Sequence, residues 1–169
     1  MTIHVYSGVI FLYVALRLIL PLRLGRKTGL LCGLLLLCIA QQHLFFRIFY
    51  GNMASPELPF PILAVASWLF IALLFLFLLL LMKDLFTCLT LPLRYVDYTM
   101  PVFLPHRVWV AALTSIALLL SAYGTTQALR TPETISYEVF LEHLPPELDG
   151  LHLVQIADLH AGPLLGASR

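Results

Sequence analysis

The feature that most constrains this sequence is an uncharged run over residues 61–82, built mainly from Leu, Phe, Ala and Ile. A helix rises about 1.5 Å per residue, so a run of about 22 residues matches the roughly 30 Å hydrocarbon core of a bilayer. Water is absent from that core, and an isolated segment can satisfy its backbone groups there only as a helix. The run therefore predicts a transmembrane helix.

Three further apolar runs cover residues 3–20, 28–46 and 108–129. Across the whole chain 60% of residues are hydrophobic and 11% are charged, whereas soluble domains carry about a quarter charged residues. The sequence thus predicts a mainly α, integral membrane fold with about four transmembrane helices. It places the protein in the cell membrane as a multi-pass protein whose partner is the lipid bilayer. The net charge of +1 and the lack of a basic stripe with interleaved aromatics give no case for nucleic-acid binding.

The connections between these runs differ in basic residues, and this difference predicts the orientation. Cytoplasmic loops of membrane proteins are enriched in Lys and Arg. One side of the expected bundle carries seven such residues and the other side carries two, so we expect the seven in the cytoplasm and both termini, with the C-terminal tail, outside it. The seven are Arg17, Arg23, Arg26, Lys27, Lys83, Arg94 and Arg107, and the two are Arg47 and Arg130.

Polar residues near the ends of the runs have two interpretations. Gln41, Gln42 and His43 are compatible with a proton or substrate path, but interfacial hydration or a hydrogen bond between helices is the favoured explanation. Arg17 is expected to extend toward the headgroups, and His4 to be exposed.

The ends of the last two runs also carry expectations. We expect the third span to end at Lys83 and Asp84, and residues 85–107 to lie along the membrane interface because prolines interrupt them. In the fourth span, Ser121, Gly124 and Thr125 form a small-residue face suited to close helix contact.

A second domain is predicted to begin after the last span. Six of the nine acidic residues follow residue 130, which indicates a change of solvent and divides the chain into a transmembrane region, 1–130, and a tail, 131–169. Residues 134–141 alternate apolar and polar side chains as in a strand. Residues 151–157 resemble a buried strand, and this second strand would end at Asp158-Leu-His160.

Asp158 and His160 are the candidate metal ligands. Side chains two positions apart on an extended segment point to one face, so a carboxylate and an imidazole could reach one Mn, Fe or Zn ion. Taken alone, the triplet is weak evidence and favours a turn Asp beside an exposed His.

The surrounding sequence resembles the opening of calcineurin-like metallophosphoesterases, and especially their membrane-associated bacterial branch. In that family a stretch of this kind forms the first core strand and the first metal motif. The resemblance covers about residues 137–166 and departs at Ala157, where Ser or Thr is usual. The matching residues are Leu144, Pro145, Leu148, Asp149, Gly150, Gln155, Asp158, Leu159, His160 and Gly162.

The resemblance implies that Asp158 and His160 bind one metal of a divalent pair, Mn, Fe or Zn, that hydrolyses a phosphoester. It implies the first one or two strands of an α/β metallophosphoesterase sandwich after the helices. The later GD, GNH and GHxH motifs do not occur in these 169 residues. We therefore expect a truncated enzyme that is inactive as this chain, has no catalytic residue of its own and holds no stable metal pair. The alternative is a non-catalytic four-helix membrane anchor or interaction protein.

Overall fold

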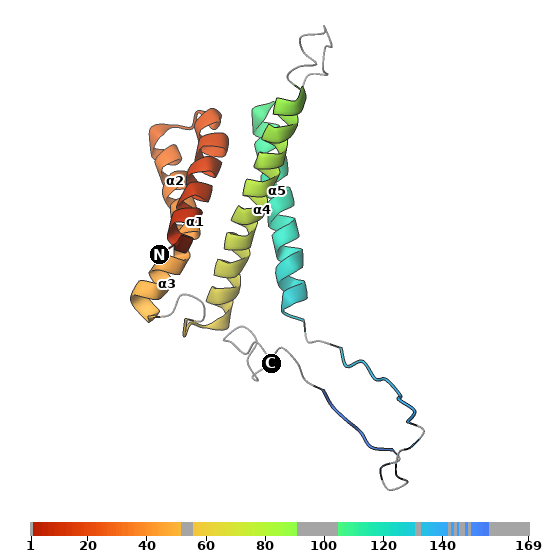
Figure 1. The fold of residues 1–169 in the computed structure, drawn as a ribbon. Helices are drawn as coiled ribbons and strands as arrows, with labels where there is room; N and C mark the ends of the chain where they lie inside the picture. Colours follow the sequence, from red (N-terminus) through yellow and green to blue (C-terminus); the bar gives the residue numbers. More distant parts are fainter. Residues whose placement is uncertain are drawn as a thin grey trace.

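The computed structural model of the protein describes residues 2–51, 56–90, 105–130, 133–141, 143, 145, 148 and 150–155. Within this part the regular structure is helical. Figure 1 shows the shorter helices grouped beside the long ones, which run antiparallel to each other. The helices are α1 (Thr2–Val14), α2 (Arg26–Ala40), α3 (Gln42–Tyr50), α4 (Phe60–Thr90) and α5 (His106–Ala128).

Three segments of the described chain are long and apolar enough to cross a membrane: Ile3–Leu22, Phe60–Thr90 and His106–Ala128. A fourth candidate consists of α2 and α3 together, which meet at an angle of 60°. The structure therefore supports three or four spans. The expected second span, 28–46, is not one straight helix, because the chain breaks at Gln41 with φ −101° and ψ 14°.

The first span changes its winding before it ends. After α1, residues Ala15–Ile19 form a π-helical turn, and Leu20–Leu22 form a 3-10 turn. Such turns are common where a helix is terminated or locally distorted. Pro21 has no backbone N–H to continue an α-helix, and Arg23 closes the segment in the left-handed region with φ 48°. Arg17 lies within the π-helical turn.

Helix α4 is longer than the sequence predicts. Its 31 residues make a rod of about 46 Å, and it continues through Lys83 and Asp84 to Thr90. The charges that we expect to end the third span do not end the helix, and the Asp84 carboxylate is paired within the bundle. Of the predicted interfacial segment 85–107, the first six residues belong to α4 and the last two begin α5, while residues 91–104 lie outside the described part.

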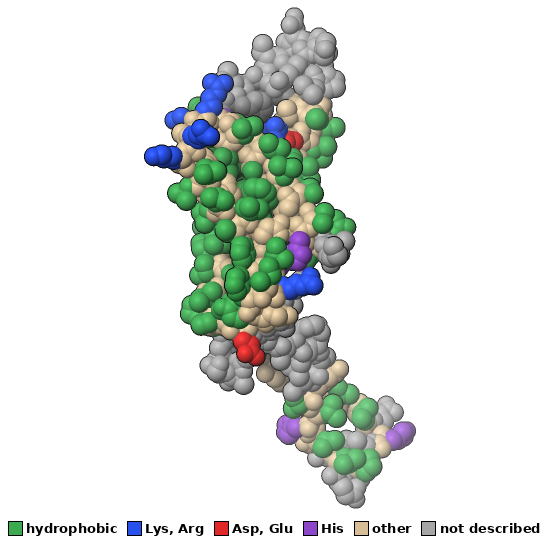
Figure 2. Space-filling model, turned by 90° about the vertical axis from the view of Figure 1, so that its left-hand side faces the viewer, with side chains coloured by type: hydrophobic (Ala, Val, Ile, Leu, Met, Phe, Trp, Pro, Cys, Tyr) green, Lys and Arg blue, Asp and Glu red, His purple; other side chains and the backbone are tan. Residues whose placement is uncertain are grey.

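The core lies mainly between α4 and α5. Leu73, Leu76 and Leu80 on α4 recur at helical spacing, and Leu113 and Ala117 on α5 are buried against the same cluster. Val14 and Ala40 complete this core from α1 and α2. Many large apolar side chains of the helices are exposed, such as Leu30, Leu89 and Leu119, as expected for helices in lipid. Figure 2 shows hydrophobic side chains covering most of the helical face in view.

Two hydrogen bonds join α4 to α5 at one level. The Ser121 hydroxyl donates to the Trp68 carbonyl at 2.6 Å, and the Trp68 indole N–H donates to the Leu118 carbonyl at 3.1 Å. Ser121 is fully buried. The predicted small-residue face is thus only partly correct, because Gly124 is exposed and a Cβ there would meet no atom within 4 Å.

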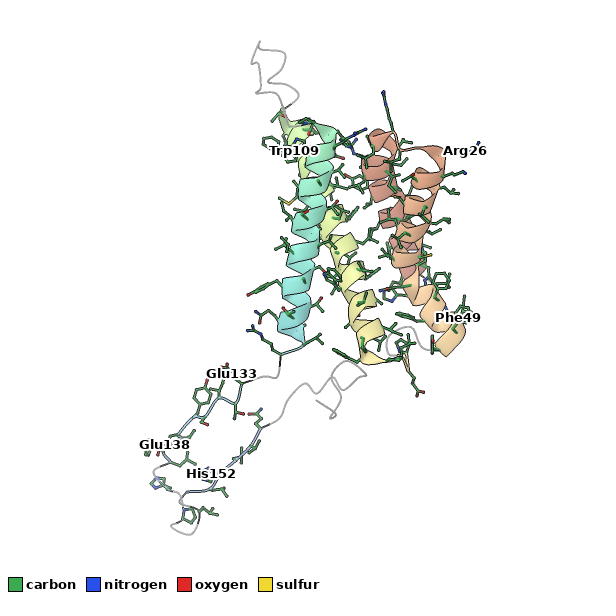
Figure 3. All side chains as sticks on the ribbon, turned by 180° about the vertical axis from the view of Figure 1, so that it is seen from behind. Arg26, Phe49, Trp109, Glu133, Glu138 and His152 are labelled. Atoms are coloured by element: carbon green, nitrogen blue, oxygen red, sulfur yellow. The ribbon has the colours of Figure 1, made fainter. Side chains whose placement is uncertain are left out.

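The two ends of the bundle differ in charge. Figure 2 shows Lys and Arg side chains gathered toward one end of the helices, and Figure 3 places Arg26 and Trp109 at that end and Phe49 at the other. Helix α5 runs from the basic end to the opposite end. The tail, with Glu133 and Glu138, therefore leaves the bundle at the end away from the basic residues (Figure 3).

The described part of the tail contains no strand. Residues 133–141 and 151–155 have no regular structure, and their side chains are exposed. The predicted buried strand is wrong over 151–155, since Leu153 is 83% exposed. A strand needs a neighbour to satisfy its backbone and a sheet face to cover its side chains, and the described residues supply neither. An α/β sandwich is accordingly not seen in this part.

Candidate functional site

The predicted metal ligands, Asp158 and His160, lie outside the described residues, so their geometry stays a prediction. The segment that leads to them is described as far as Gln155 and is exposed, including His152. Within the described ranges no group of three or more His, Cys, Asp or Glu side chains could hold a metal ion. The polar chemistry that the structure does describe lies among the helices.

One polar cluster joins the first span to α4 near the basic end. The Tyr13 hydroxyl donates to Asp84 Oδ2 at 2.7 Å, and the Arg17 guanidinium donates to Asp84 Oδ1. Lys83 Nζ lies 3.7 Å from the same Oδ1 atom. The Tyr13 ring also packs edge-on against Phe77 of α4, with ring centroids 5.3 Å apart. The Asp84 carboxylate is therefore surrounded by a hydroxyl and a guanidinium from the first span and by an ammonium from α4.

This cluster revises the role expected for Arg17. The side chain was expected only to reach toward the headgroups, but it is paired with Asp84, 67 residues away. It still keeps 46% of its side-chain surface exposed. The sequence contained both charges near span ends, but nothing in the local pattern indicated that they meet.

A cavity of about 250 Å³ opens beside this cluster. Arg17 and Pro21 line it from the first span, while the rest of its wall comes from α4 and α5. Its lining thus combines two cations and an imidazole with apolar side chains. The residues from α4 and α5 are Leu80, Lys83, His106, Trp109, Val110 and Leu113.

A second polar cluster lies where α1 meets the break between α2 and α3. The Gln41 amide donates to the His4 carbonyl at 3.1 Å, and the Ser7 hydroxyl donates to the same carbonyl at 3.2 Å. Both ring nitrogens of His4 are buried, so the expectation of an exposed His4 is wrong. For Gln41, a hydrogen bond between helices is the interpretation that the structure supports.

The neighbouring residues His43 and Gln42 occupy different surroundings. His43 packs edge-on against Phe70 of α4, with ring centroids 4.5 Å apart. Gln42 lines an apolar groove between α2, α3 and α4. The three polar residues at the end of the second run therefore do not converge on one site.

Apolar helices of spanning length with lipid-facing leucines define a helical membrane protein. The chain is similar to a protein of Danio rerio described as a transmembrane protein with metallophosphoesterase domain, at 39% identity over 54 residues. The match covers 32% of this chain and 12% of that protein. No family model matches the sequence, and no solved structure matches it.

Proposed function

We propose that this chain anchors a metal-dependent phosphoesterase in the membrane, and that Asp158 and His160 bind one metal of its catalytic site. Two findings support the proposal together. The relative is named as a transmembrane protein with a metallophosphoesterase domain, and the Asp-Leu-His motif follows the last helix of this chain. The relative comes from Danio rerio, so the likeness to the bacterial branch rests on the motif alone.

The donor types of the proposed site suit its chemistry. A carboxylate oxygen and an imidazole nitrogen are ligands for Mn, Fe or Zn, and a metal pair orients the phosphate and lowers the pKa of the attacking water. In this proposal, Asp158 and His160 hold one ion. Two side chains cannot hold a metal pair, and the further ligands would have to come from outside these 169 residues. We expect the purified chain to bind less than one equivalent of Mn, Fe or Zn.

The position of the tail adds a topological element to the proposal. Because α5 ends away from the basic residues (Figure 3), the positive-inside rule assigns the tail to the extracytoplasmic side. A phosphoesterase domain attached there would act on phosphoesters outside the cytoplasm. The α/β sandwich of that domain is likewise part of the proposal.

The proposal is tested first by the coding DNA that follows codon 169. It predicts sequences for GD-, GNH- and GHxH-type motifs in one of the three frames, and their absence would leave the phosphoesterase without its remaining ligands. If they are present, the His160→Ala variant of the encoded enzyme should lose at least about 100-fold in hydrolysis of a general phosphoester. His152→Ala is the matched control, because His152 is exposed and does not match a ligand position.

A second candidate function is a non-catalytic membrane anchor or interaction protein. The specific observation in its favour is that the buried core of the described part lies in the helices, whereas the described tail residues are exposed. If the parent protein hydrolyses no phosphoester and binds no more Mn, Fe or Zn than the His160→Ala variant, this second function is favoured.

A further inference from the structure

We propose that the cavity at the basic end of the bundle binds a phosphate-bearing ligand, and that this ligand is the headgroup of an anionic phospholipid. The inference does not depend on the proposed phosphoesterase. The cavity lies where α5 begins, at the end of the bundle opposite to the tail (Figure 3). A ligand there would be bound at the membrane surface opposite to the one at which the tail leaves the bundle.

The donors of the cavity suit a phosphate group. Arg17, Lys83 and His106 line it from three different segments of the chain. A guanidinium has five N–H donors, so Arg17 retains donors for a ligand after binding Asp84. A lysine ammonium supplies three donors, and an imidazole supplies at least one. Basic pockets between transmembrane helices are known as sites for anionic lipid headgroups.

Asp84 reduces the positive charge of this end but does not cancel it. It carries one negative charge between two cations, Arg17 and Lys83, so the local balance remains positive. Asp84 also fixes the Arg17 guanidinium by pairing with it. A side chain that is already fixed loses less conformational freedom when a ligand binds. The carboxylate therefore orients one of the phosphate donors.

The walls of the cavity favour a lipid over a soluble phosphate. Leu80, Val110 and Leu113 are apolar and continue into the membrane-spanning parts of α4 and α5. The volume of about 250 Å³ is below the range of about 300–1,000 Å³ that encloses a whole drug-sized ligand. The cavity thus fits a headgroup whose acyl chains lie outside it along the helices. Trp109 belongs to the lining, and indole rings are enriched at this level of a bilayer.

Quenching of Trp109 fluorescence tests the site. The chain contains two tryptophans, so the Trp68→Phe variant leaves Trp109 as the only one. The full chain is reconstituted in nanodiscs that contain brominated phosphatidylglycerol or brominated phosphatidylcholine. We expect phosphatidylglycerol to be preferred about fivefold, which corresponds to about 1 kcal/mol.

Two lysine variants at the same end of the protein decide whether the cavity is responsible. Lys83→Gln should remove most of the preference and Lys83→Arg should keep it. Lys27→Gln is the matched control, because Lys27 is an exposed residue of α2 and should leave the preference intact. Equal loss in Lys83→Gln and Lys27→Gln, or no preference in the parent protein, would overturn the proposal, since general surface charge would then account for binding.

The source of the phosphate is decided by competition. Millimolar inorganic phosphate should not reduce the preference for phosphatidylglycerol if the lipid walls contribute to binding. If inorganic phosphate abolishes the preference in the parent but has no effect on the residual quenching of Lys83→Gln, the cavity is a phosphate site for a soluble ligand. In that case the phosphate chemistry of the proposal is supported and the lipid is not.

Discussion

Replacing Ser121 with Leu should destabilise the contact between α4 and α5 far more than replacing Ser115 with Leu six residues earlier on α5. Ser121 has no exposed surface, and its hydroxyl lies 2.6 Å from the Trp68 carbonyl. A leucine there has no room, because the neighbouring helix backbone occupies the space that its extra atoms need. Overpacking of this kind costs about 1–3 kcal/mol.

The Ser121→Ala variant separates the hydrogen bond from the packing. It removes the bond to Trp68 without adding atoms, and hydrogen bonds between membrane helices contribute about 0.6 kcal/mol on average. We therefore expect Ser121→Ala to lower the free energy of unfolding by about 0.5–1 kcal/mol. The expected order of stability is the parent protein, then Ser121→Ala, then Ser121→Leu.

The measurement is equilibrium unfolding in mixed micelles, with increasing SDS and circular dichroism as the signal. Ser115→Leu is the matched control, because Ser115 lies on the same helix and is exposed. A surface substitution of this kind should change the free energy of unfolding by less than about 0.5 kcal/mol. If Ser115→Leu and Ser121→Leu unfold at the same SDS content, the close approach of α4 and α5 at Ser121 is refuted.

Three other predictions concern the charged cluster, the topology and the tail. Asp84→Asn should lower the free energy of unfolding by about 1 kcal/mol at most, since the half-exposed Arg17 partner is screened by solvent; a double-mutant cycle with Arg17→Gln that shows no coupling would contradict the pairing. In a background without native cysteines, a membrane-impermeant maleimide should label Glu138→Cys in intact cells and Lys27→Cys only after permeabilisation, and the reverse pattern would invert the orientation. The isolated peptide 131–169 should give a poorly dispersed amide NMR spectrum because it has too few strands for a sheet with a core, and a well-dispersed spectrum would show that it folds alone.

The helices of this protein could be predicted from the sequence because membrane insertion depends on local composition. Each apolar residue contributes to transfer into lipid almost independently of its neighbours in space. The run at 61–82 accordingly lies within α4, and α5 covers all but the last residue of the run at 108–129. The gathering of the basic residues at one end could also be predicted from the sequence. Successive spans cross the membrane in opposite directions, so every second loop lies on the same side.

The metal motif is predicted by the sequence alone, through the order of residues around Asp158 and His160. The strands expected next to it were predicted from an alternation of apolar and polar residues and from an apolar run. Such patterns indicate a strand only where partner strands are present to form a sheet. In residues 133–141 and 151–155 the pattern is present and the strands are not. A strand pattern specifies which side chains would share a face, but only partner strands supply the hydrogen bonds and the cover.

The tertiary structure decided which polar residues meet. Asp84 was expected to end the third span, and with Arg17 and Tyr13 beside it the helix itself continues to Thr90. Gln41 interrupts the second span and bonds to α1. These contacts join residues that are 37 to 71 positions apart in the chain. Local hydropathy determines which segments enter the membrane, but the pairing of their few polar groups depends on how the helices turn toward one another, and that is settled only when they pack.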